Sequence, residues 1–271
     1  MHGFDRITWQ AKLEAQIADT DHCCVQRVVV VECTPSTMDT ATACATEGPG
    51  VLVVAGSQTS GRGQHGRAWT DHGQCTLPCT LGLRLPDIDP PMLAALCACA
   101  VHESVEQLLR SAGVSMLDRV LIKWPNDIVV RSNTNDRKLA GILIEQKQGL
   151  TLIGIGINCT QTQEQWGDNL ADTAVSLRLL GVEIPGDELR ARLMCIVIDR
   201  LSHWLHARDP SAIRARYQAN DAMVGTRRRF MHNRVLYEGT VVSIDPLAEI
   251  AVQTSTGVQK LPIAQTSHAR D

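Results

Sequence analysis

A glycine- and arginine-rich segment, residues 61–69, has the composition of a loop that binds an anion. Its glycines let backbone N–H groups approach a phosphate closely, and Arg62 and Arg67 add fixed positive charge. Trp69 ends the segment and offers a flat apolar surface to a base. Taken alone, a solvated loop followed by a core aromatic explains these residues equally well.

The same segment contains the spacing G-x-G-x-x-G, which is typical of dinucleotide-binding folds. That spacing predicts a dinucleotide site only where it opens a helix directly after a strand. Here residues 68–73 are turn-like and lead into another predicted strand, at 76–85. The context therefore argues against a Rossmann-type site.

Two further segments place charged side chains beside predicted strands. Residues 123–127 combine a lysine, a tryptophan and a carboxylate at a strand end, where Pro125 turns the chain. Lys138 opens a buried strand in which Gly141 allows another group to come close to the backbone. Each segment by itself also fits an ordinary strand-to-turn junction or a charged edge residue.

Together, and in this order, these segments resemble the biotin–protein ligase family. The family pattern is a serine–threonine pair, then G-R-G-x-x-G-R-x-W, K-W-P-N-D, K-[LV]-[AS]-G-I-L-x-E and G-x-G-x-N. The matching segments of this chain are 36–37, 61–69, 123–127, 138–145 and 154–158. Five ordered motifs are far more specific than any one of them. The resemblance is close over residues 28–160 and looser in the tail.

The resemblance implies an ATP-dependent ligase that works in two steps. The carboxylate of biotin would attack the α-phosphate of ATP, giving biotinyl-5′-AMP and pyrophosphate. Biotin would then pass to a lysine of the biotin carboxyl-carrier domain of acetyl-CoA carboxylase or a similar carboxylase. Lys and Arg side chains and a Mg²⁺ ion would offset the repulsion between the two anions. Mg²⁺ is expected with ATP, but the sequence assigns no metal ligands.

The resemblance also assigns roles to residues of this chain. The expected catalytic residues are Arg62, Lys123, Asp127 and Lys138. Those expected to contact biotin are Ser36, Thr37, Gln58, Arg62, Gly63, Gln64, Lys138 and Gly141. Those expected to contact ATP or the adenylate are Arg62, Arg67, Trp69, Lys123, Asn126, Lys138 and Asn158. Asp127 would lie beside the acceptor lysine and accept its proton or orient its amine.

Two other functions compete with this one. A lipoate or octanoyl transferase of the same superfamily would lack the arginine-rich loop at 61–69, which is present. A non-catalytic biotin-binding sensor would not need the four charged residues expected to be catalytic. Residues 1–27 are too few for the winged DNA-binding domain of bifunctional family members, so we expect a monofunctional enzyme that does not bind DNA.

Hydrophobic periodicity predicts the elements that must position these residues. Helices are predicted at 8–18, after 34–37 with Ser36 or Thr37 as the cap, at 91–112, 186–207 and 209–219, and strands at 28–33, 51–56, 76–85, 119–123, 128–130, 139–146 and 150–157. After Asn220 short alternating strands follow, with turns predicted at Gly225, Glu238-Gly239, Asp245-Pro246 and Thr256-Gly257.

This pattern predicts two domains. The resemblance implies an α/β (α+β) catalytic domain over residues 1–220, a mixed β-sheet with helices like the cores of class II aminoacyl-tRNA synthetases. A small SH3-like β-barrel would follow over residues 221–271.

Composition limits the other possibilities. With 44% hydrophobic and 20% charged residues the chain is typical of globular proteins, and its net charge of −3 argues against a general nucleic-acid surface. The ten cysteines show no C-x-x-C pair, so we expect small buried side chains in a reducing cytoplasm rather than a metal site. No signal peptide is visible, and no continuous apolar run approaches the ~20 residues of a membrane span. The sequence leaves open whether the chain forms a homodimer.

Overall fold

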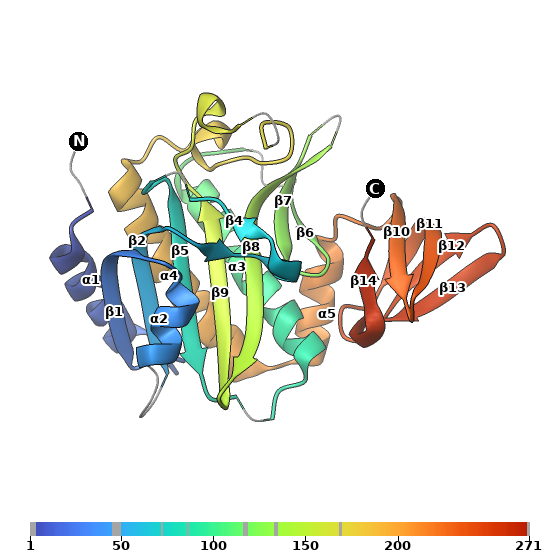
Figure 1. Ribbon diagram of the computed structural model, residues 1–271, viewed down its shortest axis with the longest axis horizontal. Coiled ribbons are helices and arrows are strands. Elements are labelled where there is room, and N and C mark those ends of the chain that lie inside the picture. Colours follow the sequence, from blue (N-terminus) through green and yellow to red (C-terminus); the bar gives the residue numbers. More distant parts are fainter. Residues whose placement is uncertain are drawn as a thin grey trace.

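A seven-stranded mixed sheet forms the centre of the computed structural model, which describes residues 4–44, 50–71, 73–85, 87–115, 119–132, 135–167 and 170–269 (Figure 1). The strand order is β1-β2-β5-β9-β8-β7-β6, with β1 and β2 parallel and the remaining neighbours antiparallel. The strands are β1 (Arg27–Thr34), β2 (Val51–Gln58), β5 (Thr76–Leu83), β6 (Val120–Lys123), β7 (Asp127–Arg131), β8 (Asp136–Lys147) and β9 (Leu150–Asn158). The expected mixed α/β fold is confirmed.

Helices and a short hairpin cover the two faces of this sheet. The long helices α3 and α4 pack together behind it in the view of Figure 1, whereas α2 and the β3–β4 hairpin cross its front. The elements are α1 (Arg6–Asp19), α2 (Thr37–Cys44), α3 (Pro90–Ser111), α4 (Gly186–Ala207), α5 (Pro210–Ala219), β3 (Gly61–Arg62) and β4 (Ala68–Trp69), with 3₁₀ turns at Gln64–Gly66, Gln163–Gln165, Arg178–Leu180 and Ile263–Gln265. The front face is therefore left open for a ligand, because only short elements cover it.

Helix α3 shows why the sequence folds in this way. Leu93, Leu96, Val105 and Leu108 recur at helical spacing, and all four are buried against the sheet and α4. Gly113 follows the helix with φ +73°, a left-handed conformation that glycine adopts without steric cost. Among the described residues α3 is the one helix long and apolar enough to cross a membrane, and 72% of its apolar window is buried inside the protein. It has the burial of a core helix.

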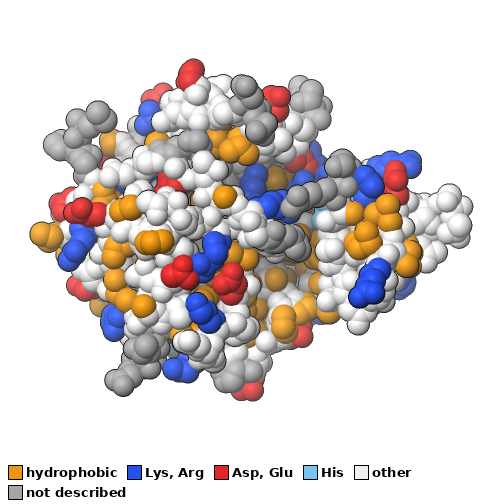
Figure 2. Space-filling view, in the orientation of Figure 1, with side chains coloured by type: hydrophobic (Ala, Val, Ile, Leu, Met, Phe, Trp, Pro, Cys, Tyr) orange, Lys and Arg blue, Asp and Glu red, His pale blue; other side chains and the backbone are white. Residues whose placement is uncertain are grey.

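A second, antiparallel sheet stands at one end of the large one, in the order β13-β12-β11-β10-β14 (Figure 1). Its strands are β10 (Arg227–His232), β11 (Val235–Ile244), β12 (Glu249–Thr254), β13 (Gly257–Pro262) and β14 (Thr266–His268). This sheet fits the expected SH3-like barrel. Between it and the large body the surface is hollowed, and Lys and Arg side chains gather around the hollow (Figure 2).

One predicted turn of the small sheet is wrong. Glu238-Gly239 lies inside β11, and the chain reverses instead at Asn233 and Arg234, whose φ angles are +49° and +66°. Gly239 is needed for close approach, because a Cβ there would lie 2.1 Å from the Gln253 carbonyl oxygen. The sequence alone does not distinguish a glycine that brings two strands together from a glycine that turns the chain.

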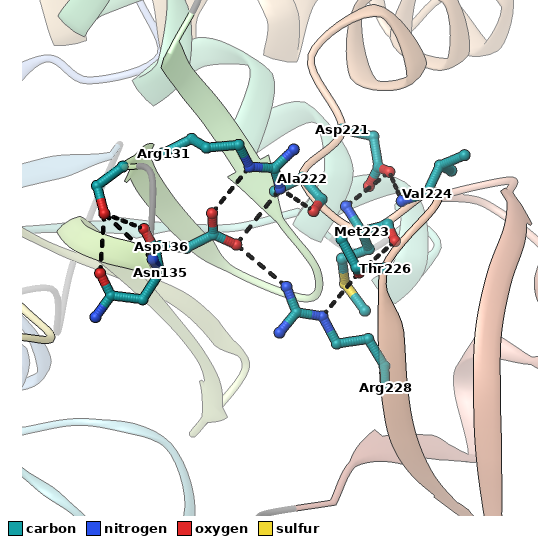
Figure 3. Close-up of polar contacts among 10 residues, drawn as sticks. Arg131, Asn135, Asp136, Asp221, Ala222, Met223, Val224, Thr226 and Arg228 are labelled. Atoms are coloured by element: carbon teal, nitrogen blue, oxygen red, sulfur yellow. Dashed lines mark hydrogen bonds and ion pairs between the residues drawn. The ribbon is translucent and has the colours of Figure 1, made fainter.

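The small sheet is joined to the large one by backbone and charge together (Figure 3). The linker pairs with β6 through Ile122, which donates to Asn220 O at 2.7 Å and accepts from Ala222 N at 2.9 Å. Asp136 receives Arg131 at 3.0 Å and Arg228, from the small sheet, at 3.1 Å. The apolar core also continues from one sheet into the other. We refer to the backbone pairing at Ile122 and the ion pairs of Asp136 with Arg131 and Arg228 as the barrel junction.

Candidate functional site

One cavity of about 820 Å³ opens on the front of the large sheet, between the loop 59–75 and the small sheet. All the residues to which the sequence assigned a role line this cavity, although they come from five separate segments. The small sheet contributes Pro246, Ile263, Ala264, Thr266, Ser267 and His268 to its wall. The structure thus brings the predicted site residues together, while their individual roles stay predictions.

At the α2 end of the cavity a chain of hydroxyl groups orients Gln58. The backbone N–H of Thr37 donates to Gln58 Oε1 at 2.8 Å, and the Thr37 hydroxyl donates to the same oxygen at 3.1 Å. Thr80 in turn donates to the Thr37 hydroxyl at 2.8 Å. The backbone N–H of Thr37 can only donate, so the Gln58 atom that it contacts must be the amide oxygen. The other end of the amide, Nε2, is therefore a hydrogen-bond donor, and Gln58 lines the cavity.

Ser36 begins the helix that this network uses. Its side-chain oxygen accepts from Met38 N at 3.3 Å, as an N-cap residue does at the start of α2. Of the two candidate caps, Ser36 is therefore the one that the structure supports. The residue is 1% exposed and lies in the cavity wall.

The floor of the cavity is a pair of facing glycines covered by Trp69. Gly141 on β8 and Gly156 on β9 are cross-strand partners. A Cβ at Gly156 would lie 2.5 Å from the Trp69 ring, and one at Gly141 would lie 2.8 Å from Lys138 Nζ. A side chain at Gly156 would have to displace the indole, and one at Gly141 would push aside the end of the Lys138 side chain. Trp69 Nε1 is buried and has no hydrogen-bond partner among the described residues.

Three charged side chains converge beside this floor. Lys138 Nζ lies 2.6 Å from Asp127 Oδ1 and 5.4 Å from the centre of the Trp69 ring. Burial, and then the nearby Arg228 guanidinium, lowers the pKa of Lys123. The site therefore holds two lysines and one carboxylate in partly buried surroundings, a suitable environment for stabilising a developing phosphate charge.

The two expected asparagines already have partners within the protein. Asn126 Nδ2 donates to Ile142 O at 2.5 Å. Asn158 Nδ2 donates to the backbone oxygen of Lys138 at 3.2 Å, and Asn158 Oδ1 accepts from Gln161 at 3.2 Å. Both amides therefore help to hold the strand ends that carry the charged residues, whatever else they contact.

Arg62 is held at the outer edge of the loop. Its guanidinium lies 2.6 Å from Asp39 and 3.7 Å from Glu145, and Lys147 lies 3.9 Å from the other Asp39 oxygen. Its side chain is 36% exposed. We refer to these four residues, Arg62, Asp39, Glu145 and Lys147, as the outer charge cluster.

Sequence reasoning missed three charged residues that hold the site. Asp71 bonds to both strand ends beside the loop, and Asp136 and Arg228 form the barrel junction. No motif marks them, because their partners are distant in sequence. The motif that contains Lys138 and Gly141 indicates Lys138 as a site residue, but it gives no indication of Asp71, Asp136 or Arg228.

The described residues do not form a dedicated site for Mg²⁺. They contain no group of three His, Cys, Asp or Glu side chains that could hold a metal. Asp127 and Asp136, the two carboxylates that line the cavity, are each paired with a cationic side chain. Any Mg²⁺ would depend on the phosphates of the nucleotide for its ligands.

Comparison with known families shows what the region that holds most of the cavity wall is similar to. Residues 30–161 match the biotin/lipoate A/B protein ligase family, and this range holds most of the cavity wall. The chain contains a domain of that family.

Two curated relatives match this ligase domain and its surroundings. The biotin–[acetyl-CoA-carboxylase] ligase of Mycobacterium tuberculosis is 33% identical over 66% of this chain. The bifunctional ligase/repressor BirA of Bacillus subtilis is 31% identical over 78% of this chain. In each case the matched part is 64% of the relative's own length.

Solved structures show the same fold beyond the ligase domain. The Aquifex aeolicus biotin protein ligase in complex with biotin and ATP gives a TM-score of 0.74 at 18% identity, over 91% of this chain and 100% of that one. The Leishmania major biotin protein ligase in complex with biotinyl-5-AMP gives a TM-score of 0.57 at 26% identity, over 88% and 99% of the two chains.

Proposed function

We propose that the chain is a biotin–protein ligase that joins biotin to a lysine of a carrier domain at the expense of ATP. The observation that carries the proposal is the single cavity in which the oriented Gln58 amide, the Trp69 floor and the Lys138–Asp127 pair meet within a ligase domain. The biotin-bound and ATP-bound relatives of the same fold support it.

In the first step the biotin carboxylate attacks the α-phosphorus of ATP, and pyrophosphate leaves. Gln58 Nε2 and the hydroxyls of Ser36 and Thr37 suit the polar ureido ring of biotin, which offers a carbonyl oxygen and N–H groups. Lys138 and Lys123 would reduce the repulsion between carboxylate and phosphate and stabilise the charge of the transition state.

In the second step the amine of the acceptor lysine attacks the acyl carbon, and AMP leaves. The amine must first lose a proton, and Asp127 is the carboxylate of the cavity nearest to Lys138, at 2.6 Å. Asp127 would accept that proton or orient the amine. The acceptor class we propose is the carrier domain of acetyl-CoA carboxylase, the enzyme that the Mycobacterium relative is named for modifying.

We further propose the residue roles assigned from the sequence, a catalytic domain over 1–220 followed by a barrel over 221–271, and a cytoplasmic location. Mg²⁺ would accompany ATP. We propose a ligase without a DNA-binding role.

The test is mass spectrometry of a carboxylase carrier domain after incubation with the protein, ATP and Mg²⁺. With biotin we expect a mass increase of one biotinyl group, no increase without ATP, and a much slower increase with Lys138→Ala. Lipoate and octanoate, offered in parallel, test the transferase alternative. Modification by these acids and none by biotin would overturn the proposal.

A further inference from the structure

Strands β2 and β5 pair with each other only over the first half of β2 and the second half of β5. Their antiparallel ladder runs from Val51–Gly82 to Val54–Cys79. Beyond it β2 continues to Gln58 paired with β1 alone, and β5 begins at Thr76 paired with β9 alone. The loop 59–75 rises from these two separated strand ends.

Asp71, within the loop, bridges the gap with one carboxylate. Asp71 Oδ2 accepts from the backbone N–H of Gln58 at 2.7 Å, and Asp71 Oδ1 accepts from the Thr76 hydroxyl at 2.8 Å. Thr76 is fully buried, so its hydroxyl has no water to replace this partner. A single side chain thus ties the loop to the last residue of β2 and the first residue of β5.

The strands themselves are held together independently of Asp71. Arg190, which is 2% exposed, donates from Nη1 to Gly56 O at 3.2 Å and to Thr76 O at 3.4 Å. Its guanidinium is oriented by Asp187 at 3.1 Å. Removal of the Asp71 carboxylate should therefore release the loop without opening the sheet.

Asp71 is tied to one residue that lines the cavity and is close in sequence to another. Gln58, whose backbone it fixes, presents Nε2 at the cavity, and Trp69, two residues before it, covers the glycine floor. Building on the proposed function, we infer that Asp71 is a positioning residue that keeps loop 59–75 closed over the acyl-adenylate. It acts through Gln58 and Trp69 and does not itself line the cavity.

The test compares three variants of the full chain by the rate at which bound biotinyl-5′-AMP is released. Asp71→Ala removes both bonds, and we expect release at least tenfold faster, with a raised KM for biotin. Thr76→Val removes one bond, and a smaller increase is expected. Asp71→Asn should restore slow release, because an amide can accept from Gln58 N–H through Oδ1 and donate to the Thr76 hydroxyl through Nδ2.

A matched control separates positioning from stability. Asp209 caps α5 by accepting from Ser211 N at 2.8 Å, away from the cavity. Asp209→Ala should lower the midpoint of thermal unfolding, as loss of an N-cap does, and leave adenylate release unchanged. Equal release rates in Asp71→Ala and the wild type, or equal effects of Asp71→Ala and Asp209→Ala, would overturn the inference.

Limited trypsin digestion of the ligand-free proteins makes the inference testable apart from ligase activity. Arg62 and Arg67 offer cleavage sites in the loop. We expect cleavage there to be faster in Asp71→Ala than in Asp71→Asn or the wild type. If the wild-type protein made no biotinyl-adenylate, the proposed function would fail, and the order of cleavage rates would still decide the role of Asp71.

Discussion

The two walls of the cavity are both held by ion pairs, but in different surroundings. At the outer charge cluster the side chains of Arg62 and Asp39 are 36% and 49% exposed. At the barrel junction Asp136 is 9% exposed and Arg228 21% exposed, and backbone bonds from Ile122 to the linker lie beside them. The same kind of contact is therefore weak in one place and strong in the other.

This difference indicates which wall moves. Exposed ion pairs are worth about 0–1 kcal/mol, because water and salt screen them. Removal of one partner from a buried pair costs roughly 3–5 kcal/mol, because the other charge is left uncompensated. We expect the small sheet to be a fixed wall, and the loop 59–75 to be a movable one that depends on Asp71 and on the ligand for its order.

The largest effect is expected at the floor that both walls enclose. Lys138→Ala should slow adenylation by on the order of 10²-fold or more, because a charge aimed at the reacting phosphate is lost. Biotin-dependent pyrophosphate exchange measures it. Lys260→Ala, which removes an exposed lysine of the small sheet paired with Glu249, should leave the rate unchanged. A near-normal rate in Lys138→Ala would show that the floor charge is not used.

Asp127 tests whether the second step uses the other half of the same pair. Asp127→Asn should slow transfer to the carrier by about 10²-fold, the lower range for loss of a general base. Adenylation should fall less, through disturbance of Lys138 at 2.6 Å. Single-turnover measurement of the two half-reactions separates them, and equal losses in both would place Asp127 with the nucleotide instead.

Substitution of Asp136 removes the ion pairs that hold the fixed wall. Asp136→Ala should lower the free energy of unfolding by about 2–3 kcal/mol, below the range for fully buried pairs because the Arg131 side chain is 39% exposed. Urea denaturation measures the change. The control, Glu238→Ala, removes a pair with Arg227, whose side chain is 75% exposed, and should cost less than about 1 kcal/mol. Similar losses in the two variants would remove the distinction between the walls.

Much of the fold was predictable, because periodicity and local turns carry it. The apolar pattern predicts strands at 139–146 and 150–157, and the structure has β8 and β9 there, joined by a turn at Gly149 with φ +75°. Glu238-Gly239 failed because a glycine can serve either a turn or a close approach, and only the partner strand distinguishes the two. The Asn233–Arg234 turn was missed because neither residue is glycine.

The site was predictable to a different extent. Ordered motifs named the residues that line the cavity, since these residue types follow the chemistry of the ligand. Asp71, Asp136 and Arg228 hold that lining in place through partners from other elements. An aspartate has the same appearance in a sequence whether it is solvated or bridges two strands, so such residues require the structure.

The smallest effect is expected at the tip of the movable wall, where this chain has the neutral amide of Gln64. Gln64 lines the cavity within the short turn Gln64–Gly66. A charge-assisted hydrogen bond contributes about 1.5–3 kcal/mol, against about 0.5–1.5 for a neutral one. A difference near 1.4 kcal/mol corresponds to tenfold in retention of the adenylate. Gln64→Arg should therefore slow release of biotinyl-5′-AMP by up to tenfold.

Trapping of the released adenylate, and blotting for stray biotin on a bystander protein, measure that retention. Gln26→Arg adds the same charge at an exposed residue that does not line the cavity, and it should change neither readout. In Asp71→Ala the benefit of Gln64→Arg should shrink, because an arginine at the tip can hold the ligand only when the base of the loop keeps it in place. If Gln64→Arg leaves retention unchanged in both backgrounds, the base alone orders the loop, and the movable wall has one point of control instead of two.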